Sequence, residues 1–360
     1  MESYALGISS ALASRGHDVC VFTRDVRAID SRFAEAGIKV RHAPLAGRFD
    51  IATAFDLASY LKRRKGCSFA IHVHHYRNAF VALLARKIAR LPAHKCRVIV
   101  TNHRCRPARE GRLLRRVYRN VDAMVFVSAL TQKRFLSRWD SGAQPFPASR
   151  MHVLHPVLFG SEGEFAELPE KGPFNLLYLG RLSPEKGLER LIGAMALLKG
   201  KRVRLTVVGT GYADYVGSLR RLAVSLGVEG LIDWKGFLDC KADIIRKCHA
   251  GIFVSSREEP FSLASLEMMS YGRTQIVPPG GAFAEWLSPS PAVSAIDLPE
   301  SADSLRLTGL SEKEIAAAVE MLSTDRELTA RLGRISAANF RRRAGSDDFI
   351  DKLCKLYGGE

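Results

Sequence analysis

Short apolar runs rich in Val, Ile and Phe alternate along the chain with longer stretches in which apolar residues recur every three or four positions. The short runs predict β-strands, and the longer stretches predict amphipathic helices. In the first half of the chain, strands are expected at 19–23, 69–74, 97–101, 123–127 and 152–154. In the second half, they are expected at 176–179, 204–208, 231–234, 251–254 and 274–277.

These two series predict an α/β fold with one doubly wound parallel sheet in each half of the chain. Between residues 159 and 173 the composition turns acidic, contains Gly and Pro and shows no apolar period, which indicates a linker. We therefore expect an N-terminal domain over 1–158, a C-terminal domain over 174–340 and a last helix over 341–360 that packs back toward the N-terminal domain. The two Rossmann-like domains would face a central cleft, because ligands bind at strand carboxyl ends in such folds.

The chain opens on a helical pattern at residues 3–15, whereas a doubly wound domain normally opens on a strand and a glycine-rich turn. We hypothesise that the natural start lies upstream, so that Met1 is an internal methionine. No run of about 18 uncharged apolar residues occurs, and the first residues lack the basic start and apolar centre of a secretory signal. The seven cysteines contain no CxxC pair. These features together predict a protein of the cytoplasm.

Positive charge is concentrated in the first half of the chain. Residues 1–158 hold 28 Lys and Arg against 10 Asp and Glu, whereas the remaining residues hold 26 against 27. This excess of positive charge in the N-terminal half predicts an anionic partner, either the headgroups of a cytoplasmic membrane leaflet or a nucleic acid backbone.

The densest basic segment, 103–119, carries Leu113, Leu114, Val117 and Tyr118 at helical spacing among its arginines. This pattern predicts a helix with one apolar and one basic face, as found at membrane surfaces. A solvated basic face is the alternative. Nucleic acid is not expected as a partner, because aromatic residues are not interleaved with the arginines as stacking platforms. We expect an anionic membrane surface, at the cytoplasmic face of the inner membrane.

Candidate chemistry begins in the sequence YLGRLSPEKGL at 178–188, where a predicted strand ends in Gly180 and a helix follows. Arg181 can bind phosphate oxygens bidentately, while Lys186 is a mobile point charge. Together they suit a diphosphate whose negative charge grows as it leaves. Two surface cations beside a helix start are the alternative interpretation.

Two glutamates, Glu259 and Glu267, lie eight positions apart after another predicted strand. Between them, a turn would aim the backbone N–H groups of Phe261, Ser262 and Leu263 at an anion. Glu267 falls among apolar residues, where a carboxylate needs a partner such as the two hydroxyls of a ribose. Glu259 could contact sugar hydroxyls or cap the following helix.

Two further strand ends carry glycine turns that could approach a ligand closely. Gly209 and Gly211 enclose a GTG turn after one predicted strand, and Phe237 and Leu238 follow a glycine after the next. A single GxG turn is a common pattern, so these positions gain meaning only beside the other motifs.

A metal site is not expected. His72, His74 and His75 lie together in HVHH, but no carboxylate or cysteine lies at ligand spacing from them. The sequence also lacks an Asp-x-Asp pair that would bind a divalent ion together with a nucleotide.

In order and spacing, GRLSPEKG, the GTG turn, GFL and the two glutamates with seven residues between them resemble the donor domain of family 4 glycosyltransferases. The N-terminal half is similar to the same family from Glu2 onward, through ALGISSALASRGHDVCVFTR and the strand end VTNH at 100–103. The resemblance covers nearly the whole chain. It implies the GT-B fold, retention at the anomeric carbon, no metal, no bound cofactor, and a nucleotide-diphosphate sugar as co-substrate.

The resemblance also implies roles for single residues. Glu267 would hold the nucleotide ribose, and Glu259 would lie near the donor sugar. His103 would approach the donor sugar from the N-terminal domain, unless it is an ordinary loop histidine. The implied catalytic residues are His103, Glu259, Arg181 and Lys186. The implied donor-binding residues are Gly180, Arg181, Lys186, Gly209, Gly211, Phe237, Leu238, Glu259, Phe261, Ser262, Leu263 and Glu267.

The implied reaction moves a hexose-type residue from a UDP- or GDP-sugar to a hydroxyl acceptor. The basic N-terminal half favours a lipid-linked saccharide as acceptor, in the biosynthesis of a cell-surface polysaccharide or lipopolysaccharide. The chain departs from the family at two places: no glycine-rich acceptor loop precedes residue 1, and Pro260-Phe261-Ser262 replaces a glycine-containing turn. The alternatives are a nucleotide-sugar epimerase or phosphorylase on the same fold, and a non-catalytic nucleotide-sugar-binding protein.

Overall fold

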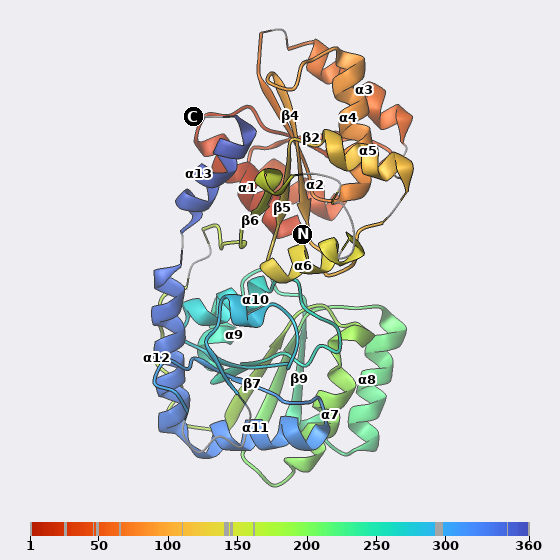
Figure 1. Cartoon of the computed structure of the whole chain (residues 1–360). Helices are drawn as coiled ribbons and strands as arrows, with labels where there is room; N and C mark the ends of the chain where they lie inside the picture. Colours follow the sequence, from red (N-terminus) through yellow and green to blue (C-terminus); the bar gives the residue numbers. More distant parts are fainter. Residues whose placement is uncertain are drawn as a thin grey trace. The chain divides into compact units, whose positions relative to one another are not determined.

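The computed structural model describes residues 2–24, 27–45, 47, 50–64, 66–109, 111–139, 144, 147–160, 163–291, 298–343 and 345–358. The chain forms two compact units (Figure 1). Unit 1 comprises Met1–Gly160 and Ala344–Glu360, and unit 2 comprises Ser161–Arg343. Each unit is an α/β body with parallel strands, as the alternating pattern predicted.

Unit 1 contains two parallel sheets among its described residues. Strands β1 (Cys20–Thr23) and β2 (Lys39–His42) pair with each other. The second sheet has the order β3-β4-β5-β6, with β3 at Phe69–Val73, β4 at Cys96–Asn102, β5 at Ala123–Phe126 and β6 at Met151–Val153. The helices of unit 1 are α1 (Glu2–Ser14), α2 (Arg27–Glu35), α3 (Ile51–Lys62), α4 (Ala79–Ala89), α5 (Arg112–Asn120), α6 (Ala129–Leu136) and α13 (Ser346–Tyr357).

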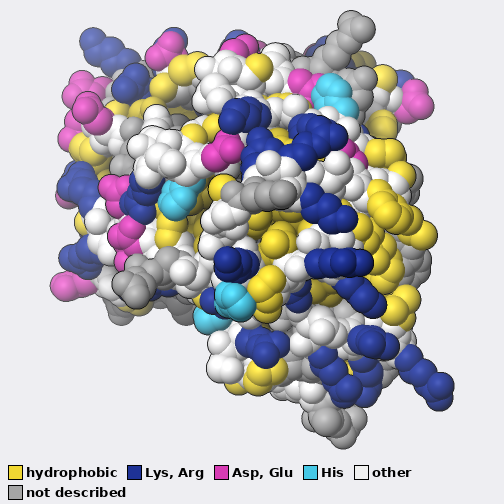
Figure 2. All heavy atoms as spheres, turned by 90° about the horizontal axis from the view of Figure 1, so that it is seen from above, with side chains coloured by type: hydrophobic (Ala, Val, Ile, Leu, Met, Phe, Trp, Pro, Cys, Tyr) yellow, Lys and Arg dark blue, Asp and Glu magenta, His cyan; other side chains and the backbone are white. Residues whose placement is uncertain are grey.

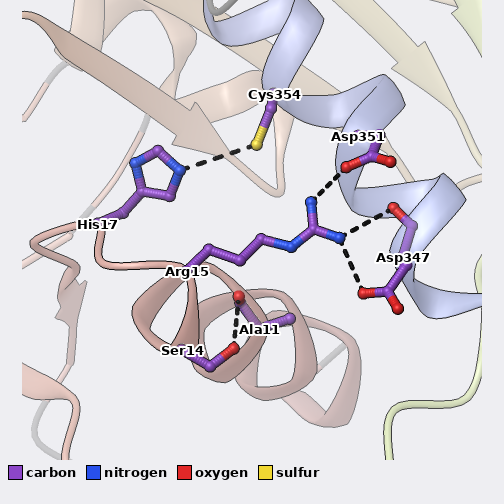
Figure 3. A network of polar contacts seen from close by, with 7 residues as sticks. All are labelled: Ala11, Ser14, Arg15, His17, Asp347, Asp351 and Cys354. Carbon is purple, nitrogen blue, oxygen red and sulfur yellow. Dashed lines mark hydrogen bonds and ion pairs between the residues drawn. The ribbon is translucent and has the colours of Figure 1, made fainter.

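The C-terminal helix α13 packs on the first helix, α1, although more than 300 residues separate them along the chain (Figure 3). Arg15, at the end of α1, donates to Asp351 at 2.5 Å and to Asp347 at 2.8 Å. These ion pairs are solvent-exposed and contribute little to stability. The larger contribution comes from the apolar contact of Tyr4, Ile8 and Leu12 with Phe349, Ile350 and Leu353, all of which are buried.

The described residues of unit 2 form one seven-stranded parallel sheet with the order β12-β13-β11-β10-β7-β8-β9. Its strands are β7 (Phe174–Leu179), β8 (Val203–Val208), β9 (Ile232–Gly236), β10 (Ala250–Ile252), β11 (Thr274–Val277), β12 (Pro289–Pro291) and β13 (Ser304–Arg306). Its helices are α7 (Leu188–Leu197), α8 (Ala213–Ser225), α9 (Ala242–Lys247), α10 (Leu263–Ser270), α11 (Glu312–Thr324) and α12 (Arg326–Arg342). Helices α7, α8 and α11 share one large apolar core with the sheet.

The boundary between the two units, after Gly160, falls within the segment expected to be a linker, 159–173. From Gly163 onward this segment belongs to unit 2 and packs along it: the backbone N–H of Gly163 donates to Ser270 at 3.0 Å, and the buried His249 contacts the carbonyl oxygen of Pro169 at 3.0 Å. An acidic segment without an apolar period can thus still be fixed by its backbone groups, which sequence periodicity does not reveal.

The strand order of unit 2 reverses beside β7. The chain passes from β7 outward to β8 and β9, and then returns so that β10 pairs with the other side of β7. The segments that follow β7 and β10 therefore diverge from a common point at the carboxyl edge of the sheet. In open α/β sheets, such a switch point is where ligands bind.

Candidate active site

The segment after β7 forms one side of the switch point. The hydroxyl of Tyr178 donates to the carbonyl oxygen of Arg181 at 2.9 Å, which fixes the turn after Gly180 and leaves the Arg181 side chain exposed. A short 3₁₀ helix, η4 (Pro184–Lys186), then ends in Gly187 with φ of 72°. A Cβ at Gly187 would lie 2.4 Å from the carbonyl oxygen of Val254, so only glycine allows the β7 and β10 extensions to approach this closely.

The segment after β10 lies against this turn. The backbone N–H of Ser256 donates to the carbonyl oxygen of Glu185 at 2.9 Å. The carboxylate of Glu259 accepts hydrogen bonds from the ammonium of Lys186 and from the hydroxyl of Ser255, the latter at 2.5 Å. Glu259 is 9% exposed, so this buried carboxylate has a cation and a hydroxyl as partners. Two predicted catalytic residues, Lys186 and Glu259, are thus in direct contact.

Helix α10 begins at Leu263, and its N-terminal cap is Ser262, whose hydroxyl accepts from the backbone N–H of Ser265 at 3.2 Å. The capping interpretation of Glu259 is therefore wrong, because Ser262 occupies the cap. The Phe261 ring packs on Trp286 with centroids 4.5 Å apart. Trp286 in turn donates to the Ser265 hydroxyl at 2.9 Å, so the turn before α10 is held by an aromatic contact and a buried hydrogen bond.

Glu267 has a partner that the sequence did not predict. Both of its carboxylate oxygens contact the ammonium of Lys241, at 2.8 and 3.1 Å. The expectation that this carboxylate needs a ligand to be satisfied is wrong, because a protein cation already pairs with it. Lys241 lies 26 positions earlier, just before α9, and no local pattern connects the two residues.

The ends of β8 and β9 extend this edge of the sheet. Gly209 donates its backbone N–H to the carbonyl oxygen of Gly236 at 2.7 Å, and Gly211 forms a parallel bridge with Leu182. Phe237 is 61% exposed just past β9, and Leu238 follows it. The backbone of the GTG turn is therefore tied to both neighbouring strand ends. Sequence reasoning missed Tyr212, which is 87% exposed at the same edge.

Unit 1 carries a cluster of histidines at the ends of β3 and β4. The Nε2 atom of His103 lies 3.5 Å from Nδ1 of His74, and the Tyr4 ring contacts both imidazoles edge-on. The two ring nitrogens of His72 contact Tyr357 at 2.7 Å and Thr101 at 2.6 Å. Burial lowers the pKa of His103 to about 3 and that of His74 to about 4, so both imidazoles are neutral at pH 7.

A neutral His103 can donate one hydrogen bond and accept another, as a contact to a sugar hydroxyl requires. Across the described ranges of the chain, no group of three or more His, Cys, Asp or Glu side chains is arranged to hold a metal ion. In this cluster, His72, His74 and His103 contact Tyr4, Tyr357, Thr101 and one another.

Family models match both units. Residues 1–156 match a glycosyl transferase 4-like domain, and residues 161–292 match the glycosyl transferases of group 1. The chain belongs to the family 4 glycosyltransferases. The motifs that suggested the family from sequence, GRLSPEKG and the two spaced glutamates, lie within the second match.

Curated relatives of this glycosyltransferase include one bacterial and one archaeal protein. It is 26% identical over 247 residues to the uncharacterized glycosyltransferase YqgM of Bacillus subtilis (strain 168), an alignment that covers 66% of this chain and 61% of the relative. It is 23% identical over 306 residues to the uncharacterized glycosyltransferase MJ1607 of Methanocaldococcus jannaschii, covering 78% of this chain and 76% of the relative. The chain thus spans less than two thirds of the Bacillus relative.

Solved structures show the same GT-B fold. Alr3699/HepE of Anabaena, in complex with UDP and glucose, superposes with a TM-score of 0.78 at 18% identity, covering 100% of this chain and 96% of that one. The lipopolysaccharide outer core galactosyltransferase WaaB, in its apo form, has a TM-score of 0.68 at 17% identity, covering 99% and 94%. These likenesses show the fold of this glycosyltransferase.

Proposed function

We propose that this glycosyltransferase moves a hexose-type residue from a UDP- or GDP-sugar to a hydroxyl acceptor, with retention at the anomeric carbon and without a metal. The observation that carries the proposal is the contact of Lys186 with Glu259 at the switch point of unit 2, in a turn that also carries the exposed Arg181. The pair combines a cation for a diphosphate with a carboxylate for sugar hydroxyls. The structure of Alr3699/HepE, which has the same fold, is a complex with UDP and glucose, and this supports a UDP-sugar donor.

In this reaction, the bond between the anomeric carbon and the diphosphate oxygen breaks, and a bond forms from that carbon to the acceptor oxygen. The electron pair of the broken bond stays on the diphosphate, and the acceptor proton passes to a diphosphate oxygen on the same face. Lys186 and Arg181 would stabilise the charge that develops on the leaving group. Glu259 would orient the sugar, and His103 would contact it as a neutral hydrogen-bonding group.

The donor site is tested by calorimetric binding of UDP, GDP, their hexose derivatives and inorganic pyrophosphate. We expect one nucleotide to bind selectively, and Glu267→Ala to weaken its binding by about tenfold or more, because a charge-assisted contact to ribose is lost. Lys201→Met is the matched control, since Lys201 pairs with Glu320 on an exposed surface of the same unit. Equal binding of all compounds, or none, would contradict the proposal and favour a chain without transferase activity.

The acceptor proposal rests on the basic surface of unit 1. We propose a lipid-linked saccharide acceptor at a cytoplasmic membrane leaflet, in cell-surface polysaccharide or lipopolysaccharide biosynthesis. The basic N-terminal half supports this, and one protein of the same fold, WaaB, is a lipopolysaccharide galactosyltransferase. None of the helices in the described ranges is long and apolar enough to cross a membrane. Figure 2 shows Lys and Arg side chains gathered on one face of the molecule, with hydrophobic side chains between them.

Helix α5 contributes to the basic surface differently from the sequence expectation. Leu114, Val117 and Tyr118 are buried in the core of unit 1, so the apolar face of α5 is not available to a membrane. The expectation that Leu113 shares that face is wrong, because Leu113 is 46% exposed. Among the described residues of the basic segment 103–119, the exposed side chains are those of Arg104, Arg106, Pro107, Arg109, Arg112, Leu113, Arg116 and Arg119. Attraction to a membrane would therefore be mainly electrostatic.

An electrostatic contact predicts binding that depends on salt and lipid charge. We expect the protein to sediment with phosphatidylserine-containing vesicles at low salt and to be released as the salt concentration rises. Replacing Arg112, Arg116 and Arg119 by glutamine should weaken this binding by about a hundredfold, at roughly 1 kcal/mol per arginine. The control variant replaces Lys199, Arg202 and Arg204, three exposed cations of unit 2, by glutamine. Equal losses in both variants would argue against a specific membrane-facing surface on α5.

A further inference from the structure

The pair formed by Lys241 and Glu267 joins two parts of unit 2 that are separate in the sequence. Lys241 lies at the N-terminal boundary of α9, in the connection that follows β9, while Glu267 lies within α10. The ammonium contacts both carboxylate oxygens, at 2.8 and 3.1 Å. The side chains are 30% and 18% exposed, so the pair lies at the surface of the unit and is accessible to a ligand.

A cation that contacts both oxygens restricts the rotation of the carboxylate. The terminal torsion of a glutamate side chain is broad, so holding the carboxylate in one orientation lowers its conformational entropy. Without Lys241, this loss would reduce the free energy of ligand binding. Each carboxylate oxygen has about two acceptor positions. Lys241 donates to each oxygen, and among the described residues this leaves a second position on each oxygen open. Two vicinal hydroxyls require this number of acceptors.

We propose that Lys241 is a positioning residue that presents the Glu267 carboxylate to the two ribose hydroxyls of the donor nucleotide, and so sets the preference for ribonucleotides over deoxyribonucleotides. The inference rests on the proposed role of Glu267 in holding the ribose. Lys241 acts through Glu267: without the ammonium, the carboxylate turns freely, and the two hydroxyls lose their pre-oriented acceptors.

A purely structural ion pair between α9 and α10 gives a different expectation. Partly exposed ion pairs contribute little to stability, so loss of a structural pair would change the melting midpoint slightly and the binding of every nucleotide to the same extent. A positioning role instead changes the ratio of the affinity for the ribonucleotide to the affinity for its deoxy form. The ratio is insensitive to a general loss of folded protein, because both ligands report on the same sample.

The experiment measures the dissociation constants of the selected nucleoside diphosphate, its 2′-deoxy form and its 3′-deoxy form by calorimetry. The proteins are the full chain, Lys241→Met, Glu267→Ala and the double variant, with Lys201→Met as control because Lys201 forms a Lys–Glu pair elsewhere in unit 2. We expect the unchanged chain and the control to prefer the ribonucleotide by at least about tenfold, as for a hydrogen bond to a charged group. Lys241→Met should reduce this preference to about threefold or less, and Glu267→Ala should abolish it.

The double variant distinguishes action through Glu267 from an independent contact. If Lys241 acts through the carboxylate, the double variant has the same preference as Glu267→Ala alone, so the two effects are not additive. If Lys241→Met keeps the full preference for the ribonucleotide, the inference is overturned, and the Lys241–Glu267 pair has only a structural role. Unchanged preference in Glu267→Ala overturns both the ribose contact and the role of Lys241, while the absence of any nucleotide binding in the unchanged chain refutes the proposed function itself.

Discussion

Replacing Lys186 by methionine is expected to lower the turnover of the donor sugar by roughly 10²–10³-fold, the usual effect of removing one preorganised group that stabilises developing charge. The ammonium contacts the buried Glu259 at the switch point of unit 2. The measurement is the release of nucleoside diphosphate from the UDP- or GDP-sugar with water as acceptor, which requires no knowledge of the natural acceptor. Nucleotide affinity should fall far less than turnover, because charge on the leaving group grows only as the bond breaks.

A second variant separates this effect from misfolding. Lys186→Met leaves the carboxylate of Glu259 buried without its cation, which destabilises the unit. The double variant Lys186→Met/Glu259→Gln removes both charges, so we expect its melting midpoint to return toward that of the unchanged chain while turnover stays low. Turnover within threefold of the unchanged chain in Lys186→Met would contradict a role of Lys186 at the leaving group.

The fold could be predicted from the sequence wherever a buried strand is a continuous apolar run. Strands β7, β8, β10 and β11 were found in this way, because a parallel sheet covered on both faces needs such runs. Strand β2, Lys39–His42, was missed because its sequence KVRH contains a single apolar residue, and its first and last positions are exposed. Strands β12 and β13 were missed because their sequences, PSP and SLR, contain no run of apolar residues.

The candidate site could be predicted only in part, because the predictable residues are those that closely follow a predicted strand. Lys186 and Glu259 each follow a strand, and parallel strands bring such residues to one edge of the sheet, so both could be assigned to one site, although their direct contact was not predicted. Lys241 was missed because its partner is reached across two strand connections, and a lysine just before a helix has no pattern of its own. The same limit explains α5: periodicity indicated an amphipathic helix, but only the structure shows that Leu114 and Val117 are in the core.

Replacing Gly209 by alanine is expected to destabilise unit 2 by about 3 kcal/mol or more, from the sum of backbone strain and overpacking. Gly209 has a φ of 142°, which side chains other than glycine rarely adopt, and a Cβ there would lie 1.8 Å from the carbonyl oxygen of Gly180. The melting midpoint should fall by roughly 10 °C for a domain of this size. Gly230→Ala is the matched control, because a Cβ at Gly230 meets nothing within 4 Å.

The position of Gly209 connects this loss of stability to the donor site. Its backbone N–H donates to Gly236 at the end of β9, while Gly180 donates to Val208 just before it, so three strand ends are joined around this glycine. An alanine must push Gly180 away, and Arg181 and Lys186 follow Gly180 in the same turn. We therefore expect Gly209→Ala to weaken nucleotide binding even at temperatures where the protein is folded. Wild-type affinity in the folded variant would show that the strand ends can separate without disturbing the donor site.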